Sequence, residues 1–220
     1  GYIYTFMNTS LTLGAFTASA DTTLGAGTGT VTVGPAIIGS GATLTFGLGD
    51  ASTILAGSIT GSSASTSNLA FNTTGSATVS GAVGTLNNIT VTNSGGLTFQ
   101  NTVTAGNVSI ASTTAGATVA IQGNLNLTGD LTGAGSSAYT LALAGAVNTI
   151  GGAGSFTATG GTMAINVHAT YSSSFAGGLV NTAGSTNLIG SVSTVGTTSL
   201  NLSAVTLVGN ARVVTANGPL

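Results

Sequence analysis

The sequence predicts an all-β protein, and within that class a right-handed parallel β-solenoid (β-helix) with short strands and Gly/Ser/Thr/Asn turns. Alternation of apolar and small polar residues recurs along the chain, which is typical of strands with one buried face. Lys and Glu are absent and 36 residues are Gly, a composition that penalises helices. One strand–turn–strand unit is also echoed further along the chain, as solenoid coils require.

The alternating segments give the expected strands in chain order. They are 11–13, 30–33, 43–46, 89–92, 97–99, 108–110, 119–121, 125–127, 141–143, 163–167 and 200–202. Gly-containing clusters such as 93–96 and 151–154 lie between them, and their Gly residues are expected to supply the positive φ angles of tight turns.

Internal similarity favours stacked coils. Residues 88–99 are echoed by residues 107–121, an offset of about 19 residues that suits one solenoid coil of two or three strands. We expect one repetitive domain over 1–220, with the Ser-rich run 62–67 as a loop excursion. Strand spacing alone also fits a β-sandwich filament subunit, so that alternative stays open.

This register predicts the core. Thr90, Thr92, Thr98, Ser109, Ala120 and Asn126 should point outward. The side chains expected to point inward and to stack on like residues of adjacent coils are Ile89, Val91, Leu97, Phe99, Val108, Ile110, Val119, Ile121, Leu125 and Leu127.

Charge excludes several function classes. Charged residues make up 2% of the chain, with Lys+Arg 1 and Asp+Glu 3, whereas an ordinary soluble domain has roughly a quarter. A nucleic-acid partner is excluded because no basic surface exists to neutralise phosphates. Without Cys there is no disulfide, thiolate metal site or thiol nucleophile. We expect a non-enzymatic protein with no catalytic residue, cofactor or metal.

His168 is the one imidazole of the chain. If Met163, Ile165 and Val167 form the inward set of a strand, alternation places His168 on the outer face. The nearest Asp in sequence is Asp130, so a plain surface imidazole is favoured over a catalytic triad.

The acidic residues Asp21, Asp50 and Asp130 all lie in turn contexts. Their carboxylates are expected to accept hydrogen bonds from the backbone of their own turns. Residues 47–50 match a fragment of the calcium-binding Gly/Asp nonapeptide, but that motif must recur every nine residues and here it does not.

Two further patterns in the sequence do not by themselves indicate a function. Asn-x-Ser/Thr sequons occur about as often as this composition predicts by chance, at Asn8, Asn72, Asn88, Asn107, Asn126 and Asn201. The pairs Thr30/Thr32 and Thr43/Thr45 resemble the flat faces of ice-binding solenoids, but in the sequence they do not recur in aligned ranks.

Residues 96–106, 190–196 and 200–202 resemble the repeats of filamentous-haemagglutinin-type and autotransporter-passenger β-solenoids. The resemblance is best over 80–220. It implies a large bacterial surface or secreted protein, and an extracellular or cell-surface location. Proteins of this kind usually carry more Asp, Lys and Asn on their outer faces, so the outer face here is expected to pack against something.

The leading functional hypothesis is a structural or adhesive segment of an extracellular bacterial fibre or cell-surface protein. It implies self-association into a fibre or sheet, and a ligand on a host or neighbouring cell. The main alternative is a pilin-like β-sandwich subunit that polymerises by strand donation. An ice-binding solenoid ranks below both, as does an outer-membrane β-barrel, whose strands need about 9–11 residues and aromatic girdles.

The two ends of the sequence carry expectations of their own. Residues 1–10 lack the basic and apolar regions of a signal peptide, and no apolar run is long enough for a transmembrane helix. Residues 216–220 repeat the turn-to-strand pattern of 93–97, which makes Leu220 the first inward residue of a further strand. We therefore expect this chain to be a segment of a longer protein.

Overall fold

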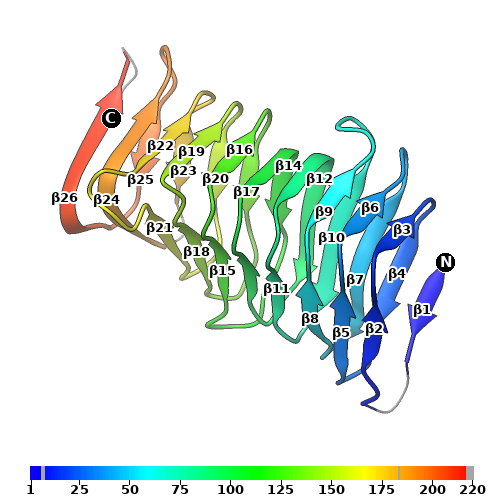
Figure 1. The fold of residues 1–220 in the computed structure, drawn as a ribbon. Coiled ribbons are helices and arrows are strands. Elements are labelled where there is room, and N and C mark those ends of the chain that lie inside the picture. Colours follow the sequence, from blue (N-terminus) through cyan, green and yellow to red (C-terminus); the bar gives the residue numbers. More distant parts are fainter. Residues whose placement is uncertain (6–7, 183, 217–220) are drawn as a thin grey trace.

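The computed structural model describes residues 1–5, 8–182 and 184–216, which form a stack of β coils (Figure 1). The described residues contain no helix, and 26 strands form one sheet whose described pairings are all parallel. This confirms the prediction of a parallel β-solenoid. The β-sandwich alternative is wrong, because the sheets of such a sandwich are antiparallel.

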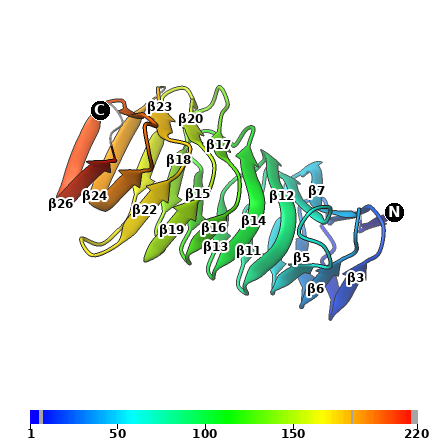
Figure 2. The same ribbon diagram turned by 90° about the horizontal axis from the view of Figure 1, so that it is seen from above.

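Each coil has three sides, and each side is a ladder of strands from successive coils (Figure 2). We name the sides the first, second and third face. The first face contains β1 (Tyr2–Tyr4), β4 (Thr22–Gly25), β7 (Thr43–Asp50), β10 (Asn68–Thr73), the second part of β12 (Val83–Asn93), the second part of β14 (Val103–Ile110), β17 (Leu131–Gly133), β20 (Gly154–Phe156), β23 (Leu179–Asn181) and β25 (Leu200–Leu202).

The other two faces are built in the same way. The second face contains β2 (Leu11–Leu13), β5 (Thr30–Val33), β8 (Thr53–Ala56), β11 (Ala77–Val79), β13 (Leu97–Phe99), β15 (Thr118–Ile121), β18 (Thr140–Leu143), β21 (Thr162–Ile165) and the first parts of β24 (Ser185–Thr194) and β26 (Val205–Thr215). The third face contains β3 (Phe16–Ala18), β6 (Ala36–Ile38), β9 (Ile59–Gly61), the first parts of β12 and β14, β16 (Leu125–Leu127), β19 (Val147–Ile150), β22 (Ser172–Phe175) and the second parts of β24 and β26.

Coil length varies while the register is kept. Ile89 pairs with Val108, 19 residues further on, as the internal echo predicted. Leu44 pairs with Leu69, which is 25 residues away. The corners between faces absorb the difference, so inward positions still stack on inward positions from coil to coil.

The core follows the alternation. The predicted inward side chains from Ile89 to Leu127 are all buried, and Phe99 is 1% exposed. Like residues stack across coils: Leu97 pairs with Val119 and Phe99 with Ile121. The predicted outward side chains are exposed or half-buried. Non-directional apolar burial therefore holds each coil to the next in addition to the backbone ladder.

Glycines at the corners serve two different purposes. Gly96 has a φ of 144°, so the expectation of a positive-φ turn holds there. At 151–154 that expectation is wrong, because none of the glycines has a positive φ. A Cβ on Gly152 would instead lie 2.1 Å from Asp130 Oδ1, so this corner needs Gly for close approach to the preceding coil.

The run 62–67 connects β9 to β10 as a short loop. Its residues Ala64 to Thr66 are exposed, whereas Ser67 is fully buried. The Ser67 hydroxyl contacts the carbonyl oxygens of Ile38 (3.1 Å) and Gly39 (2.9 Å). The loop excursion is therefore tied to the preceding coil at its C-terminal end.

The core becomes partly polar in the coils of β19 to β24. The Asn148 amide donates to Ser173 Oγ (3.0 Å), which in turn donates to Asn166 Oδ1 (2.8 Å). Asn166 then donates to the Ile189 (3.0 Å) and Ser191 (2.9 Å) carbonyls. Because buried polar groups need partners, this chain of bonds fixes the register of these coils.

Tyr139 lies in the turn before β18 and is 2% exposed. Its ring makes an edge contact with Phe156, with centroids 5.3 Å apart. Within the described residues its hydroxyl has no hydrogen-bond partner, and burial raises the pKa of Tyr139. A Cβ on Gly133 would lie 2.8 Å from this hydroxyl, so Gly133 makes room for it.

Replacing Tyr139 by Phe is expected to increase the free energy of unfolding by about 1 kcal/mol, because it removes a buried hydroxyl without a partner. The raised pKa in the folded state adds a pH dependence. The contribution of Tyr139 to the free energy of unfolding is fully present below the ordinary tyrosine pKa of about 10. It falls as pH rises above that value, since this tyrosine then ionises only in the unfolded chain. Urea denaturation from neutral to alkaline pH should show a shallower decline for the variant. A parallel decline in both proteins would contradict this assignment.

β26 is exposed along most of its length, including Val205, Leu207 and Val208. The interpretation of Leu220 as the first inward residue of a further strand lies outside the described residues.

Candidate binding surface

The outward side chains form ranks along each face. On the second face Thr12 pairs with Thr32, and Thr78 pairs with Thr98. Single Thr residues therefore stack on this face, but the Thr-x-Thr pairs do not, because Thr30 and Thr32 pair with Thr53 and Leu55. Thr30/Thr32 and Thr43/Thr45 also lie on different faces, because β5 belongs to the second and β7 to the first.

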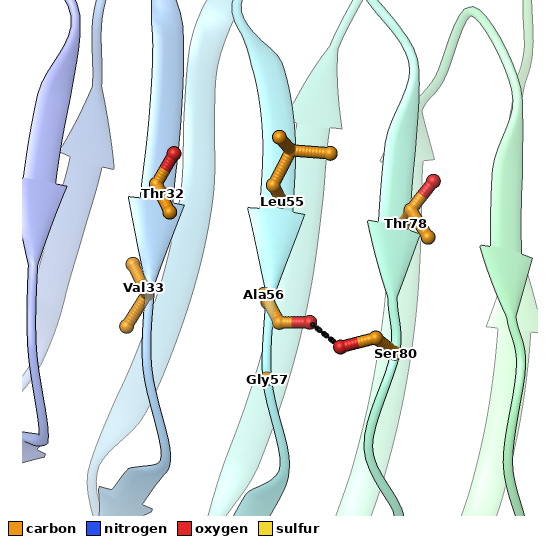
Figure 3. Close-up of a pocket in the computed structure, with 7 residues that line it drawn as sticks. All are labelled: Thr32, Val33, Leu55, Ala56, Gly57, Thr78 and Ser80. Atoms are coloured by element: carbon orange, nitrogen blue, oxygen red, sulfur yellow. Dashed lines mark hydrogen bonds between the residues drawn. The ribbon is translucent and has the colours of Figure 1, made fainter.

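On β8 the outward position in this row of Thr side chains is occupied by Leu55, which is 45% exposed. It lies between Thr32 and Thr78 of the neighbouring strands, at a shallow depression of about 310 Å³ (Figure 3). Gly57 also lines the depression, and Ser80 Oγ donates to the Ala56 carbonyl at its edge (3.1 Å). This surface offers apolar and hydroxyl contacts and no charge.

An asparagine ladder follows the corner between the third and first faces. Asn88 Nδ2 donates to Asn68 Oδ1 (3.2 Å), and Asn107 Nδ2 donates to Asn88 Oδ1 (3.0 Å). Asn107 Oδ1 accepts from the Asp130 backbone N–H (2.8 Å). This ladder was not predicted from the sequence, although Asn recurs at intervals of one coil.

The carboxylates bind backbone groups, but mostly not those of their own turns. Asp21 Oδ1 accepts from Thr43 N (2.9 Å) and Asp130 Oδ1 from Ala153 N (2.7 Å), each in the following coil. Asp50 does both, because it accepts from Ser52 N (3.2 Å) in its own turn and from Gly27 N (3.1 Å) in the preceding coil. The own-turn expectation is wrong for Asp21 and Asp130, since stacked coils bring another N–H closer.

His168 is exposed, but not for the predicted reason. β21 ends at Ile165, Asn166 takes a φ of 63°, and Val167 is 56% exposed rather than inward. His168 Nδ1 lies 2.9 Å from Thr170 Oγ1, and its ring centroid is 5.3 Å from that of Tyr171. Neither of these contacts is to a carboxylate.

The sequons differ in accessibility. Asn88 and Asn107 donate within the asparagine ladder, so a glycan on Nδ2 would crowd the neighbouring amide. Asn72 is half-buried. Asn8, Asn126 and Asn201 are exposed.

No three His, Cys, Asp or Glu residues gather closely enough to hold a metal ion in the part of the chain that the structure describes. Within the same residues, no helix has the length and hydropathy to cross a membrane. Comparison with family models, curated proteins and solved structures yields no match.

Proposed function

We propose that this chain is a non-enzymatic structural or adhesive segment of an extracellular bacterial fibre or cell-surface protein. The observation that carries the proposal is the continuity of all three ladders through the described coils. Such a stack is a stiff spacer, because each coil packs on both neighbours. The resemblance of residues 96–106, 190–196 and 200–202 to repeats of large surface proteins supports the same assignment.

Removing one coil in register tests the spacer role. Because Val119 pairs with Leu141, deletion of 119–140 joins Thr118 to Leu141 and removes one full coil. The shortened protein should fold, and its length should fall by about 4.8 Å. The chain has no Cys, so spin labels on cysteines placed at Thr32 and Ala164 can report that distance.

Duplication of 119–140 is the matched control and should lengthen the same distance by the same amount. Cells that display either form on a surface anchor should attach to a host or neighbouring cell as well as cells that display the original chain do. An unfolded deletion variant, an unchanged distance, or loss of attachment with both forms would contradict the spacer proposal.

We also propose that copies of the chain self-associate through these uncharged faces. The outward ranks carry hydroxyls, methyls and exposed apolar residues such as Ile37 and Leu55, with little charge to repel a second copy. Light scattering should show association that changes little between low and high salt. A stable monomer at high concentration and low salt would contradict it.

A further inference from the structure

One connection between the second and third faces is longer than its counterparts in the other coils. The connection from the second to the third face is two or three residues long at 14–15, 34–35, 57–58, 80–82, 100–102, 122–124 and 144–146. Between β21 and β22 it spans 166–171 (Figure 1). Insertions in one repeat commonly carry binding function, because the stack itself holds them in place.

Hydrogen bonds join the longer connection to β24 and close it on itself. Asn166 is 3% exposed, and its amide donates to the Ile189 and Ser191 carbonyls of β24. Tyr171 N donates to the His168 carbonyl (3.1 Å), and Ser191 N donates to the Tyr171 carbonyl (2.8 Å). The loop that carries the ring pair of His168 and Tyr171 is therefore hydrogen-bonded to β24 at both of its ends.

A hollow of about 190 Å³ lies beside this loop, between it and the strands β24 and β26. It is lined by Ala169, Gly190, Ser191, Asn210, Ala211 and Arg212. Arg212 is the only Lys or Arg of the chain, and among the described residues its guanidinium makes no ion pair or hydrogen bond. The loop that carries the only His thus borders the hollow that contains the only permanent positive charge.

We propose that this corner binds a carboxylate-bearing sugar, a ligand class that the spacer role does not require. Arg212 would hold the carboxylate, because a guanidinium matches a carboxylate with two parallel hydrogen bonds. Asn210 and Ser191 supply an amide and a hydroxyl for sugar hydroxyls, and the Ala169 and Ala211 side chains supply small apolar contacts. Because the hollow is small and open, affinity in the millimolar range is expected.

Titration of the isotope-labelled chain with galacturonate, followed by NMR, tests the proposal. The amide signals of Ala169, Gly190, Ser191 and Arg212 should shift with galacturonate, and much less with galactose or acetate at equal concentration. Arg212→Gln should weaken binding by roughly tenfold or more. Thr206→Ala, an outward change on the second-face part of β26, is the matched control and should bind as the original chain does.

Unshifted signals at these amides, equal binding of galactose or acetate, or unchanged affinity in Arg212→Gln would each overturn the proposal. The remaining amide signals report whether Arg212→Gln stays folded. None of these results bears on rod length, so a failure here is distinguishable from a failure of the spacer role.

Discussion

Truncating Phe99 to alanine is expected to lower the free energy of unfolding by about 3–5 kcal/mol. Phe99 is 1% exposed, and its ring makes an edge contact with Phe71 at a centroid distance of 5.9 Å. Val79 and Ile121 flank it in the adjacent coils. The backbone ladders on both sides limit collapse around the missing ring, so a cavity should remain.

Urea denaturation measures this loss. Thr98→Ala is the matched control, because Thr98 is the neighbouring outward residue of the same strand and should change stability by less than about 0.5 kcal/mol. Equal effects of the two substitutions would contradict the inward register of β13.

Replacing Gly123 by alanine is expected to destabilise the protein by about 1–3 kcal/mol through overpacking. A Cβ at this position would lie 2.2 Å from the carbonyl carbon of Asn101 and 2.5 Å from the nitrogen of Thr102. These are backbone atoms of the preceding coil, so they cannot rotate away as a flexible side chain would. Relief requires the two coils to separate at this corner.

Gly84→Ala is the control for the change in chain entropy, because a Cβ on Gly84 meets nothing within 4 Å. That variant should be neutral or more stable by up to about 1 kcal/mol. Thermal unfolding of the pair separates the two causes. Equal melting temperatures would show that close approach of the coils does not restrict Gly123.

The local sequence pattern was sufficient to predict the strands with clear alternation, such as 97–99 and 119–121. A period of two places alternate side chains on the inward face of the strand. It missed strands such as β20 and β22, whose residues are largely Gly or Ser. Ser172–Phe175 becomes a strand because β19 and β24 offer register partners on both sides. Its intrinsic preference would not select that conformation.

The surroundings of His168 and of the Asp residues likewise depended in part on contacts between coils. Val167 and His168 continue an apparent alternation, yet the buried amide of Asn166 ends the strand before them by bonding to β24. The acceptor role of the three Asp residues was predictable, but the partner coil was not.

The sequence by itself determined the all-β class, the coil period near 88–110 and the low charge, because these depend on residue type and spacing within a short window. Only the tertiary structure decided which residues twenty positions apart become neighbours. It placed Asn68, Asn88 and Asn107 in one ladder, and it set Arg212 beside the loop that carries His168. Coil lengths between 19 and 25 residues shift these alignments from turn to turn, and the packing of each corner sets the length.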